Sequence, residues 1–450
     1  MENFKDLYLK NYKGYALDLL KNLISYESVL DTYRENSEIP FGVGCKGVLE
    51  YFLNNAKKDG FNVLNVDNYA GHVEFGTSNE ILGILGHLDV VPVEGQKWAT
   101  NPFELTIKDG IMYARGVNDD KGPVVASYVA LKMIKDLNIK PNYKVRLIVG
   151  CDEESGSRCL ERYFSKQEKP SISFSPDADF PGIYGEKGNV SYDILVDSDN
   201  VITSFVSGTR YNIVPELAKA KLNIDVKDKY LKYLKDNNIS GEVLNDEYIM
   251  YGKASHAMCP ENGINAAVNL FKFISEATSS KLAKFVTTYF YNDTYGKKIG
   301  YYDYDDEMKH LTSNFAVVDI NSCGGKIGVN CRIPKDSDIE LIKEKIDFIT
   351  KPYGYSYNVI HATGIHYVSP DSHLMKTLYE SYKKISGDNT NKPNTIGGGT
   401  YAHDLENSVA FGPLFPGRED VCHIANEYMY ESDFDLMVEI YFNAICELIK

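Results

Sequence analysis

The sequence contains little cysteine, and none of its cysteines form close pairs. Eight cysteines occur among 450 residues, with no Cys-x-x-Cys motif. This density is too low for a disulfide-rich scaffold, so we expect reduced cysteines and a cytoplasmic protein. The N-terminus carries charges throughout and lacks the apolar core of a signal peptide, which agrees with that expectation.

Positive charge and long apolar runs are also scarce. Lysine and arginine number 48 against 63 aspartates and glutamates, which gives a formal net charge of −15. Nucleic-acid backbones are bound by clustered lysine and arginine, so this acidic balance argues against a nucleic-acid partner. The most apolar stretch, 81–93, contains His87 and Asp89 and is shorter than the about 20 residues that span a bilayer. We therefore expect no membrane association either.

The first part of the chain alternates between strand-like and helix-like segments. Residues 81–85, 144–149 and 172–174 are short apolar runs typical of buried strands. Residues 46–58 and 121–137 have apolar positions at helical spacing. Strands that alternate with helices predict an α/β sheet covered by helices.

The pattern changes after Gly188. Residues 190–196 and 218–226 are strand-like, whereas residues 263–277 and 339–349 have helical spacing. This mixture predicts an inserted α+β domain.

The chain then returns to the first domain. A helix is expected near 372–386, a strand at 408–411 and a closing helix from about Ser432. We therefore predict one domain from residues 1–187 and 375–450, and an inserted domain from residues 188–374.

Candidate metal ligands follow several of the predicted strands. His87 comes after 81–85, Glu153 and Glu154 after 144–149, and Asp177 after 172–174. Ligand sites of open α/β sheets form outside the carboxyl ends of the strands, so these groups are expected to converge.

Two further candidates stand elsewhere. Asp119 precedes the 121–137 helix, whose positive end favours anions, and His423 follows the 408–411 strand and a loop. Singly, each candidate has an ordinary explanation, such as a core histidine or a helix cap. Together, two histidines and at least three carboxylates form a donor set that suits divalent cations. Three carboxylates and a hydroxide balance the charge of two such cations, which favours two metals over one.

Five segments resemble motifs of the M20 family of di-zinc peptidases, and most closely its PepV-like dipeptidase branch. They are G-H-L-D-V-V-P (86–92), R-G-V-N-D-D-K-G (115–122), D-E-E-S-G (152–156), S-P-D-A-D-F-P (175–181) and G-R-E-D-V-C-H-I-A-N-E (417–427). The resemblance implies a zinc-peptidase-like α/β catalytic domain with a mostly parallel central sheet, interrupted by an α+β lid domain.

The resemblance also implies a role for each ligand. His87 and Asp177 would hold one metal, Glu154 and His423 the other, and Asp119 would bridge them. The metals would most readily be Zn²⁺, with Mn²⁺ or Co²⁺ as alternatives.

Two acidic residues would act beside the metals. Asp89 would accept the second ring N–H of His87 and fix its tautomer. Glu153 matches the general base that takes a proton from the attacking water.

Further resemblances concern the substrate. His256, in 252–266, matches a lid histidine that reaches the oxyanion, and Asn212, in 210–215, matches a substrate-binding lid position. Arg332, in 330–334, would bind a carboxylate bidentately, although an ordinary strand-edge charge explains it equally well without the resemblance. Gly398 lies in a glycine-rich loop whose bare backbone would approach the substrate. His403 departs from the branch, which commonly has arginine there.

The favoured interpretation is a dipeptidase that acts on small peptides with a free amino end, with a monomer as the favoured state and a homodimer as the alternative. An N-acyl-amino-acid deacylase or desuccinylase of the same superfamily is the first alternative. A non-catalytic binding protein is the second, and the retention of Glu153 and all five ligand positions argues against it.

Overall fold

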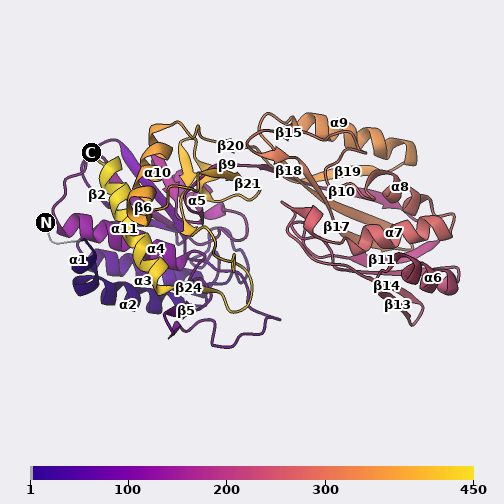
Figure 1. Cartoon of the computed structure of the whole chain (residues 1–450), viewed down its shortest axis with the longest axis horizontal. Coiled ribbons are helices and arrows are strands. Elements are labelled where there is room, and N and C mark those ends of the chain that lie inside the picture. Colours follow the sequence, from indigo (N-terminus) through magenta and orange to yellow (C-terminus); the bar gives the residue numbers. More distant parts are fainter. Residues whose placement is uncertain (1–3) are drawn as a thin grey trace. The chain divides into compact units, whose positions relative to one another are not determined.

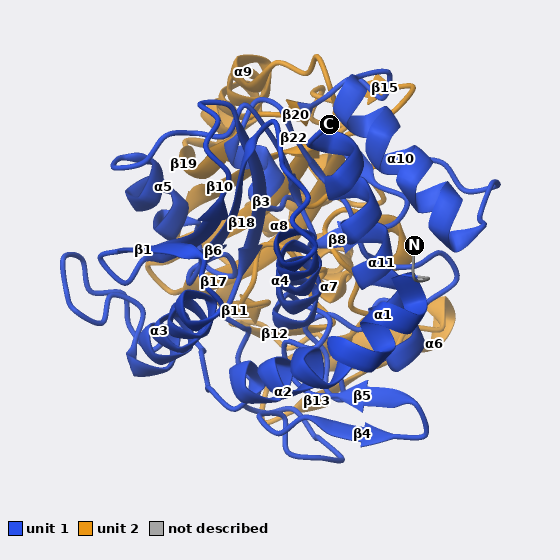
Figure 2. Ribbon diagram, turned by 90° about the vertical axis from the view of Figure 1, so that its left-hand side faces the viewer, with its two compact units in different colours: residues 1–185, 367–394, 399–450 blue, residues 186–366, 395–398 orange. Residues whose placement is uncertain are grey.

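A computed structural model describes residues 4–450, which form two compact units (Figure 2). Unit 1 contains the residues up to Gly185, Tyr367–Asn394 and Gly399–Lys450, and unit 2 contains Glu186–His366 and Thr395–Gly398. These limits differ in three places from the predicted domains 1–187 plus 375–450 and 188–374. Residues 367–374 belong to unit 1, whereas residues 186–187 and the short segment 395–398 belong to unit 2.

Unit 1 is built on a nine-stranded mixed sheet in the order β1-β2-β6-β3-β7-β22-β9-β20, with β21 paired to β9. The strands are β1 Asn62–Val66, β2 Ala70–Phe75, β3 Ile81–His87, β6 Lys144–Gly150, β7 Ile172–Ser175, β9 Ile183–Glu186, β20 His366–Tyr367, β21 Asn394–Ile396 and β22 Ser408–Ala410. The four central strands β6, β3, β7 and β22 are parallel, as predicted. The outer pairs β1–β2, β2–β6 and β22–β9 are antiparallel, which the sequence patterns did not indicate.

The helices of unit 1 cover this sheet. They are α1 Phe4–Asn11, α2 Lys13–Ile24, α3 Val43–Lys58, α4 Lys121–Asp136, α5 Arg158–Phe164, α10 His373–Ser386, α11 Glu431–Leu448 and the 3-10 helix η3 Tyr401–Asp404. Helix α4 packs on β3 and β6, and α2 and α11 pack on α4, with α11 shown in yellow in Figure 1. This arrangement buries α4 on nearly every side.

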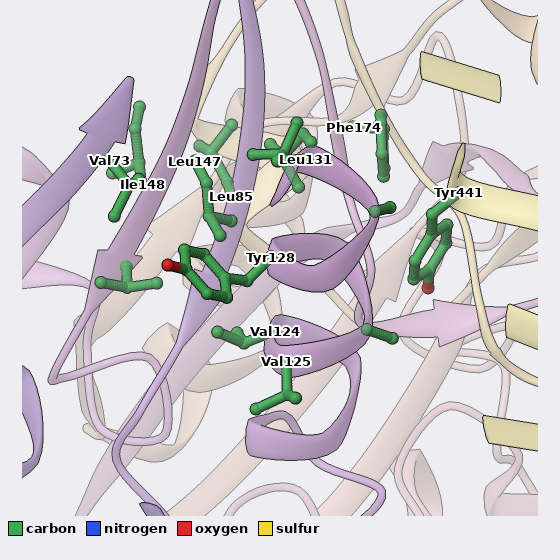
Figure 3. Close-up of a cluster of buried hydrophobic side chains, with 14 of the residues drawn as sticks. Val73, Leu85, Val124, Val125, Tyr128, Leu131, Leu147, Ile148, Phe174 and Tyr441 are labelled. Carbon is green, nitrogen blue, oxygen red and sulfur yellow. The ribbon is translucent and has the colours of Figure 1, made fainter. Parts of the chain in front are cut away.

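The core of unit 1 lies between α4 and the sheet (Figure 3). Val124, Tyr128 and Leu131 lie along α4 at helical spacing, and all are completely buried. They face strand residues such as Leu85 and Leu147. β3 is buried at all seven positions, which explains its continuous apolar sequence.

Two small sheets complete unit 1. β4 Thr106–Lys108, β5 Ile111–Tyr113 and β24 Tyr428–Tyr430 form one, and β8 Ala178–Asp179 pairs with β23 Pro413–Leu414 in the other. The β5–β24 pairing places the segment before α4 beside the segment before α11.

Unit 2 contains an antiparallel sheet in the order β13-β14-β12-β11-β17-β18-β10-β19. Its strands are β10 Gly188–Asp197, β11 Ile202–Ser207, β12 Leu217–Leu222, β13 Gly241–Leu244, β14 Glu247–Tyr251, β17 Thr312–Asn321, β18 Gly324–Ile333 and β19 Ser356–Thr363. The short strands β15 Tyr304–Asp305 and β16 Lys309–His310 pair separately. The strand predicted at 218–226 ends at Leu222, where the chain turns toward α6.

Helices and alternate strand residues form the core of unit 2. The helices are α6 Lys227–Asn237, α7 Ala266–Ala277, α8 Lys281–Tyr289, α9 Ile339–Thr350 and the 3-10 helices η1 Pro260–Asn262 and η2 Lys351–Tyr353. In β10, Val190, Tyr192 and Ile194 all contribute to this core, because every second residue of a strand faces the same side. The combination of helices with an antiparallel sheet agrees with the predicted α+β class.

Within residues 4–450 the structure has no helix that combines the length and apolarity needed to cross a membrane. All eight cysteines are free thiols, and Cys45, Cys151 and Cys159 are buried in unit 1.

Candidate metal centre

The sheet of unit 1 brings three ligand-bearing segments to one edge. His87 is the last residue of β3, Glu154 follows β6, and Asp177 follows β7. Because β6, β3 and β7 are adjacent and parallel, their carboxyl ends open on the same side. Asp119 enters from the segment before α4, and His423 from the loop between β23 and β24.

These five side chains form two groups that share one member. In the first, His87 Nε2 lies 2.9 Å from Asp119 Oδ1 and 3.6 Å from Asp177 Oδ2. In the second, His423 Nε2 lies 3.0 Å from Asp119 Oδ2 and 3.1 Å from Glu154 Oε2. The ligand atoms of each group all lie within 4.8 Å of one another. Asp119 directs one carboxylate oxygen toward each group.

The chemistry of these groups fits two divalent cations. Each group offers one imidazole nitrogen and carboxylate oxygens, the donors that Zn²⁺, Mn²⁺ and Co²⁺ accept. Within residues 4–450, buried Glu154 Oε1 makes no hydrogen bond, and buried His87 Nε2 makes none of good geometry although Asp119 Oδ1 lies 2.9 Å away. Buried polar atoms ordinarily have a partner, so these two are consistent with atoms that bind a metal.

Electrostatics at the two groups favour bound positive charge. Burial lowers the pKa of His423, but its contacts with Asp119 and Glu154 outweigh that effect and raise the pKa to about 11. The pKa of His87 is likewise raised well above its usual value by neighbouring carboxylates, despite complete burial. Burial, with the nearby Asp119 carboxylate, raises the pKa of Glu154 to about 7. The carboxylates therefore lie close enough to repel one another unless cations separate them.

Asp89 contacts His87 in a different way from the one predicted. The backbone carbonyl of Asp89 lies 3.0 Å from His87 Nδ1, whereas its carboxylate Oδ1 is 3.5 Å away. The Asp89 carboxylate instead accepts the backbone N–H groups of Glu153 and Glu154, each at 3.2 Å. Asp89 thus orients His87 mainly through its main chain, and its side chain fixes the loop that carries the two glutamates.

Glu153 occupies the loop after β6, which is held from both ends. Arg158 donates to both carboxylate oxygens of Asp152 at 2.7 Å, and Ser155 Oγ donates to the same carboxylate. Burial raises the pKa of Glu153 well above its usual value. A carboxylate with a raised pKa is better suited to accept a proton at neutral pH.

Two acidic residues of this site were assigned no role from the sequence. Asp120 Oδ2 accepts the backbone N–H of His87 at 3.0 Å. Glu427 is completely buried, and its Oε1 accepts the backbone N–H groups of Asn118 at 2.8 Å and Asp119 at 3.1 Å. Both act on the main chain, and a sequence motif does not reveal which backbone groups a side chain will meet. The only available signal was their place in the segments 115–122 and 417–427.

The predicted lid residues Asn212 and His256 lie close together in unit 2. Ile213 and His256 form an isolated antiparallel bridge, and the Ala257 N–H donates to the Asn212 carbonyl at 2.9 Å. Thr312 Oγ1 donates to the Ala257 carbonyl at 2.8 Å, which ties this segment to the first residue of β17.

Arg332 lies on β18 directly opposite Thr312 on β17. Its side chain is 8% exposed, and its Nε donates to Asn330 Oδ1 at 3.1 Å. Burial lowers its pKa to about 10. It forms no ion pair with any carboxylate among residues 4–450, so a buried guanidinium is available to an anionic group.

The glycine-rich loop contains one glycine that local packing requires and one that it does not. A Cβ at Gly397 would lie 2.5 Å from Met258 Cβ, so packing within unit 2 requires glycine at that position. A Cβ at Gly398 would meet only Ile396 Cδ1, at an ordinary 3.7 Å. The predicted approach of the Gly398 backbone to a substrate stays a prediction. His403 lies in η3 of unit 1.

Comparison with known proteins places the whole chain among peptidases. Residues 83–447 match Peptidase family M20/M25/M40. A protein of Staphylococcus haemolyticus named "Putative dipeptidase SH1171" is 36% identical over 462 aligned positions, which cover 98% of each chain.

Solved structures show the same fold. Human carnosine dipeptidase 1 aligns with a TM-score of 0.59 at 15% identity, covering 99% of this chain and 97% of that one. An M20 family metallo-carboxypeptidase from Sulfolobus solfataricus aligns with a TM-score of 0.59 at 19% identity, covering 96% and 98%. This likeness confirms the predicted fold class, an α/β catalytic domain interrupted by an α+β lid domain. The chain therefore belongs to Peptidase family M20/M25/M40, the metal-dependent family that its sequence motifs resemble.

Proposed function

We propose that this peptidase hydrolyses dipeptides with a free amino end, using two divalent cations. The observation that carries the proposal is the sharing of Asp119 between two groups of candidate ligands. A carboxylate with one oxygen directed to each group suits a pair of cations, such as those of two-metal hydrolases. Zinc is the favoured metal, with manganese or cobalt as alternatives.

The proposed roles follow from the chemistry of each residue. His87, Asp177 and Asp119 would hold one cation, and Asp119, Glu154 and His423 the other. When bound, such cations lower the pKa of water and polarise a carbonyl group. The Glu153 carboxylate would accept a proton from the attacking water and pass it to the leaving amine.

Arg332 supports recognition of an amino-acid carboxylate. A guanidinium binds a carboxylate through two parallel N–H donors, and Arg332 forms no ion pair with a carboxylate among residues 4–450. Asn212 is proposed to hold the substrate backbone, and Gly398 to pass close to it.

The alternative substrate is an N-acyl amino acid. It carries the same carboxylate as a dipeptide, so Arg332 suits both substrates. The two substrate classes differ in the free amino group, which only the dipeptide has. The relative from Staphylococcus haemolyticus carries a dipeptidase name, which favours the first proposal.

A hydrolysis screen tests this choice. Dipeptides, tripeptides and N-acyl amino acids are supplied to the purified protein with Zn²⁺ or Mn²⁺, and release of the C-terminal amino acid is measured. We expect cleavage of dipeptides only. Preference for N-acyl amino acids would establish the alternative, and no cleavage in any class would favour a binding protein.

His256 is proposed to stabilise the oxyanion that develops during hydrolysis. We expect His256→Ala to lower kcat by about 10²–10³, the usual effect of losing one oxyanion donor. Metal content should stay unchanged, because His256 is not a proposed ligand. His373→Ala, at the start of α10, serves as a control that should leave both properties unchanged. Loss of metal in parallel with activity in His256→Ala would contradict the proposed role.

A further inference from the structure

Two segments that carry candidate ligands lie side by side in unit 1. β5 and β24 pair at Tyr113 and Tyr428, and the Ala114 N–H donates to the Glu427 carbonyl at 3.2 Å. The chain then continues from Ala114 to Asp119, and it reaches Glu427 from His423. The candidate ligands Asp119 and His423 therefore each lie only a few residues from the short sheet that contains β5 and β24.

Glu427 fixes the first segment from within the protein. Its Oε2 accepts Arg115 Nη1 at 2.7 Å and the Gly116 N–H at 3.0 Å. With the two N–H groups bound by Oε1, this completely buried carboxylate accepts four hydrogen bonds. The backbone that bears Asp119 is thus held by a charged acceptor, the stronger kind of hydrogen-bond partner.

Gln96 connects Arg115 to the segment that carries His423. Its Oε1 accepts Arg115 Nη2 at 2.8 Å and Trp98 Nε1 at 3.1 Å, while its Nε2 donates to the His423 carbonyl at 2.9 Å. These partners satisfy both ends of the amide. They form a continuous path from Asp119 through Glu427, Arg115 and Gln96 to His423.

The segment at His423 needs such support. His423 has a φ of +64°, in the left-handed region that non-glycine residues seldom occupy. Asn426, with a φ of +61°, accepts the Ala99 N–H on its side chain at 2.7 Å. The 96–99 segment therefore contacts both left-handed positions, and conformations of this kind persist where the surroundings impose them.

We propose that Gln96 and Glu427 are positioning residues, which set the geometry of the proposed metal centre without touching a cation. This inference rests on the proposed function and adds that the two residues should affect the two cations differently. Gln96 holds His423, which belongs to one ligand group, whereas Glu427 holds Asp119, which belongs to both. Loss of Gln96 should therefore weaken the binding of one cation, and loss of Glu427 should weaken the binding of both.

Titration of the metal-free protein with Zn²⁺, in competition with a coloured chelator, tests this asymmetry. We expect two dissociation constants for the wild type. Gln96→Ala should raise one of them by about tenfold or more, the usual effect of losing a residue that orients a ligand, and leave the other unchanged. Glu427→Gln should raise both, since it removes the charge that binds Arg115.

Gln167→Ala is the matched control, because Gln167 is also half-buried and also donates its amide to a backbone carbonyl, that of Lys166 at 2.8 Å. It should leave both constants unchanged. Trp98 is the only tryptophan of the chain, so its fluorescence gives a second readout. Its emission should change as the cation beside His423 binds, and Gln96→Ala should abolish that change.

Four outcomes would contradict the inference or the proposed function. Wild-type constants in Gln96→Ala would overturn the inference, and so would an equal rise of both constants together with a lower Tm. A wild type that binds fewer than two Zn²⁺ ions would instead contradict the proposed function. Should Gln96→Ala not fold, Trp98→Phe removes the N–H donated to Gln96 and is expected to raise the same single constant. Wild-type values in that variant would overturn the inference.

Discussion

Glu153→Gln is expected to lower kcat by about 10²–10⁴, the usual contribution of a general base, while both cations stay bound. Glutamine has the size of glutamate but does not accept a proton at neutral pH. The backbone N–H of residue 153 would still donate to Asp89, so the loop after β6 should keep its position. Turnover of a dipeptide and metal content measured on the same preparation check both parts of this prediction.

A control separates the role of Glu153 from a general effect of removing negative charge. Glu161 is exposed on α5, a short distance along the chain, and Glu161→Gln should keep full turnover. Unchanged turnover in Glu153→Gln would exclude it as the base. Loss of metal in that variant would make it a ligand instead.

Asp119→Asn should affect both cations at once. The amide keeps one oxygen and loses the charge, so neither group retains its shared carboxylate. We expect both Zn²⁺ dissociation constants to rise by more than the about 10–100-fold that loss of an orienting residue costs. Dipeptide turnover at limiting metal should fall to the level of the chelator-treated wild type.

The number of dissociation constants that change in Asp119→Asn tests whether Asp119 is shared by both cations. A change in only one dissociation constant would show that Asp119 does not bridge the two positions. Asp18→Asn, an exposed aspartate on α2, is the matched control and should bind both ions as the wild type does.

Much of unit 1 could be predicted because local sequence and tertiary position agree there. The strands β3, β6 and β7 are continuous apolar runs, since they are buried on both faces, and each is followed by polar residues at the sheet edge. These two features together identified His87, Glu154 and Asp177 as candidate ligands. The antiparallel outer strands were less evident because β1 is largely exposed and its sequence lacks an apolar run.

The contacts that position the candidate ligands could not be predicted. The acceptor for His87 Nδ1 is the carbonyl of Asp89, and Glu427 binds the backbone N–H of Asp119 from more than 300 positions along the chain. Such contacts depend on how backbone groups meet in three dimensions, and they leave no spacing pattern in the sequence. The placement of 395–398 in unit 2 could not be predicted for the same reason. It depends on a tertiary contact, because Gly397 packs against Met258 where a side chain would not fit.

The most direct test is to locate the metals in the protein itself. The chain is reconstituted with Zn²⁺, freed of excess metal, analysed for metal content and crystallised for anomalous diffraction. We expect two ions per chain, one bound by His87, Asp119 and Asp177 and the other by Asp119, Glu154 and His423. A single ion, or two ions that do not share Asp119, would contradict the two-metal centre.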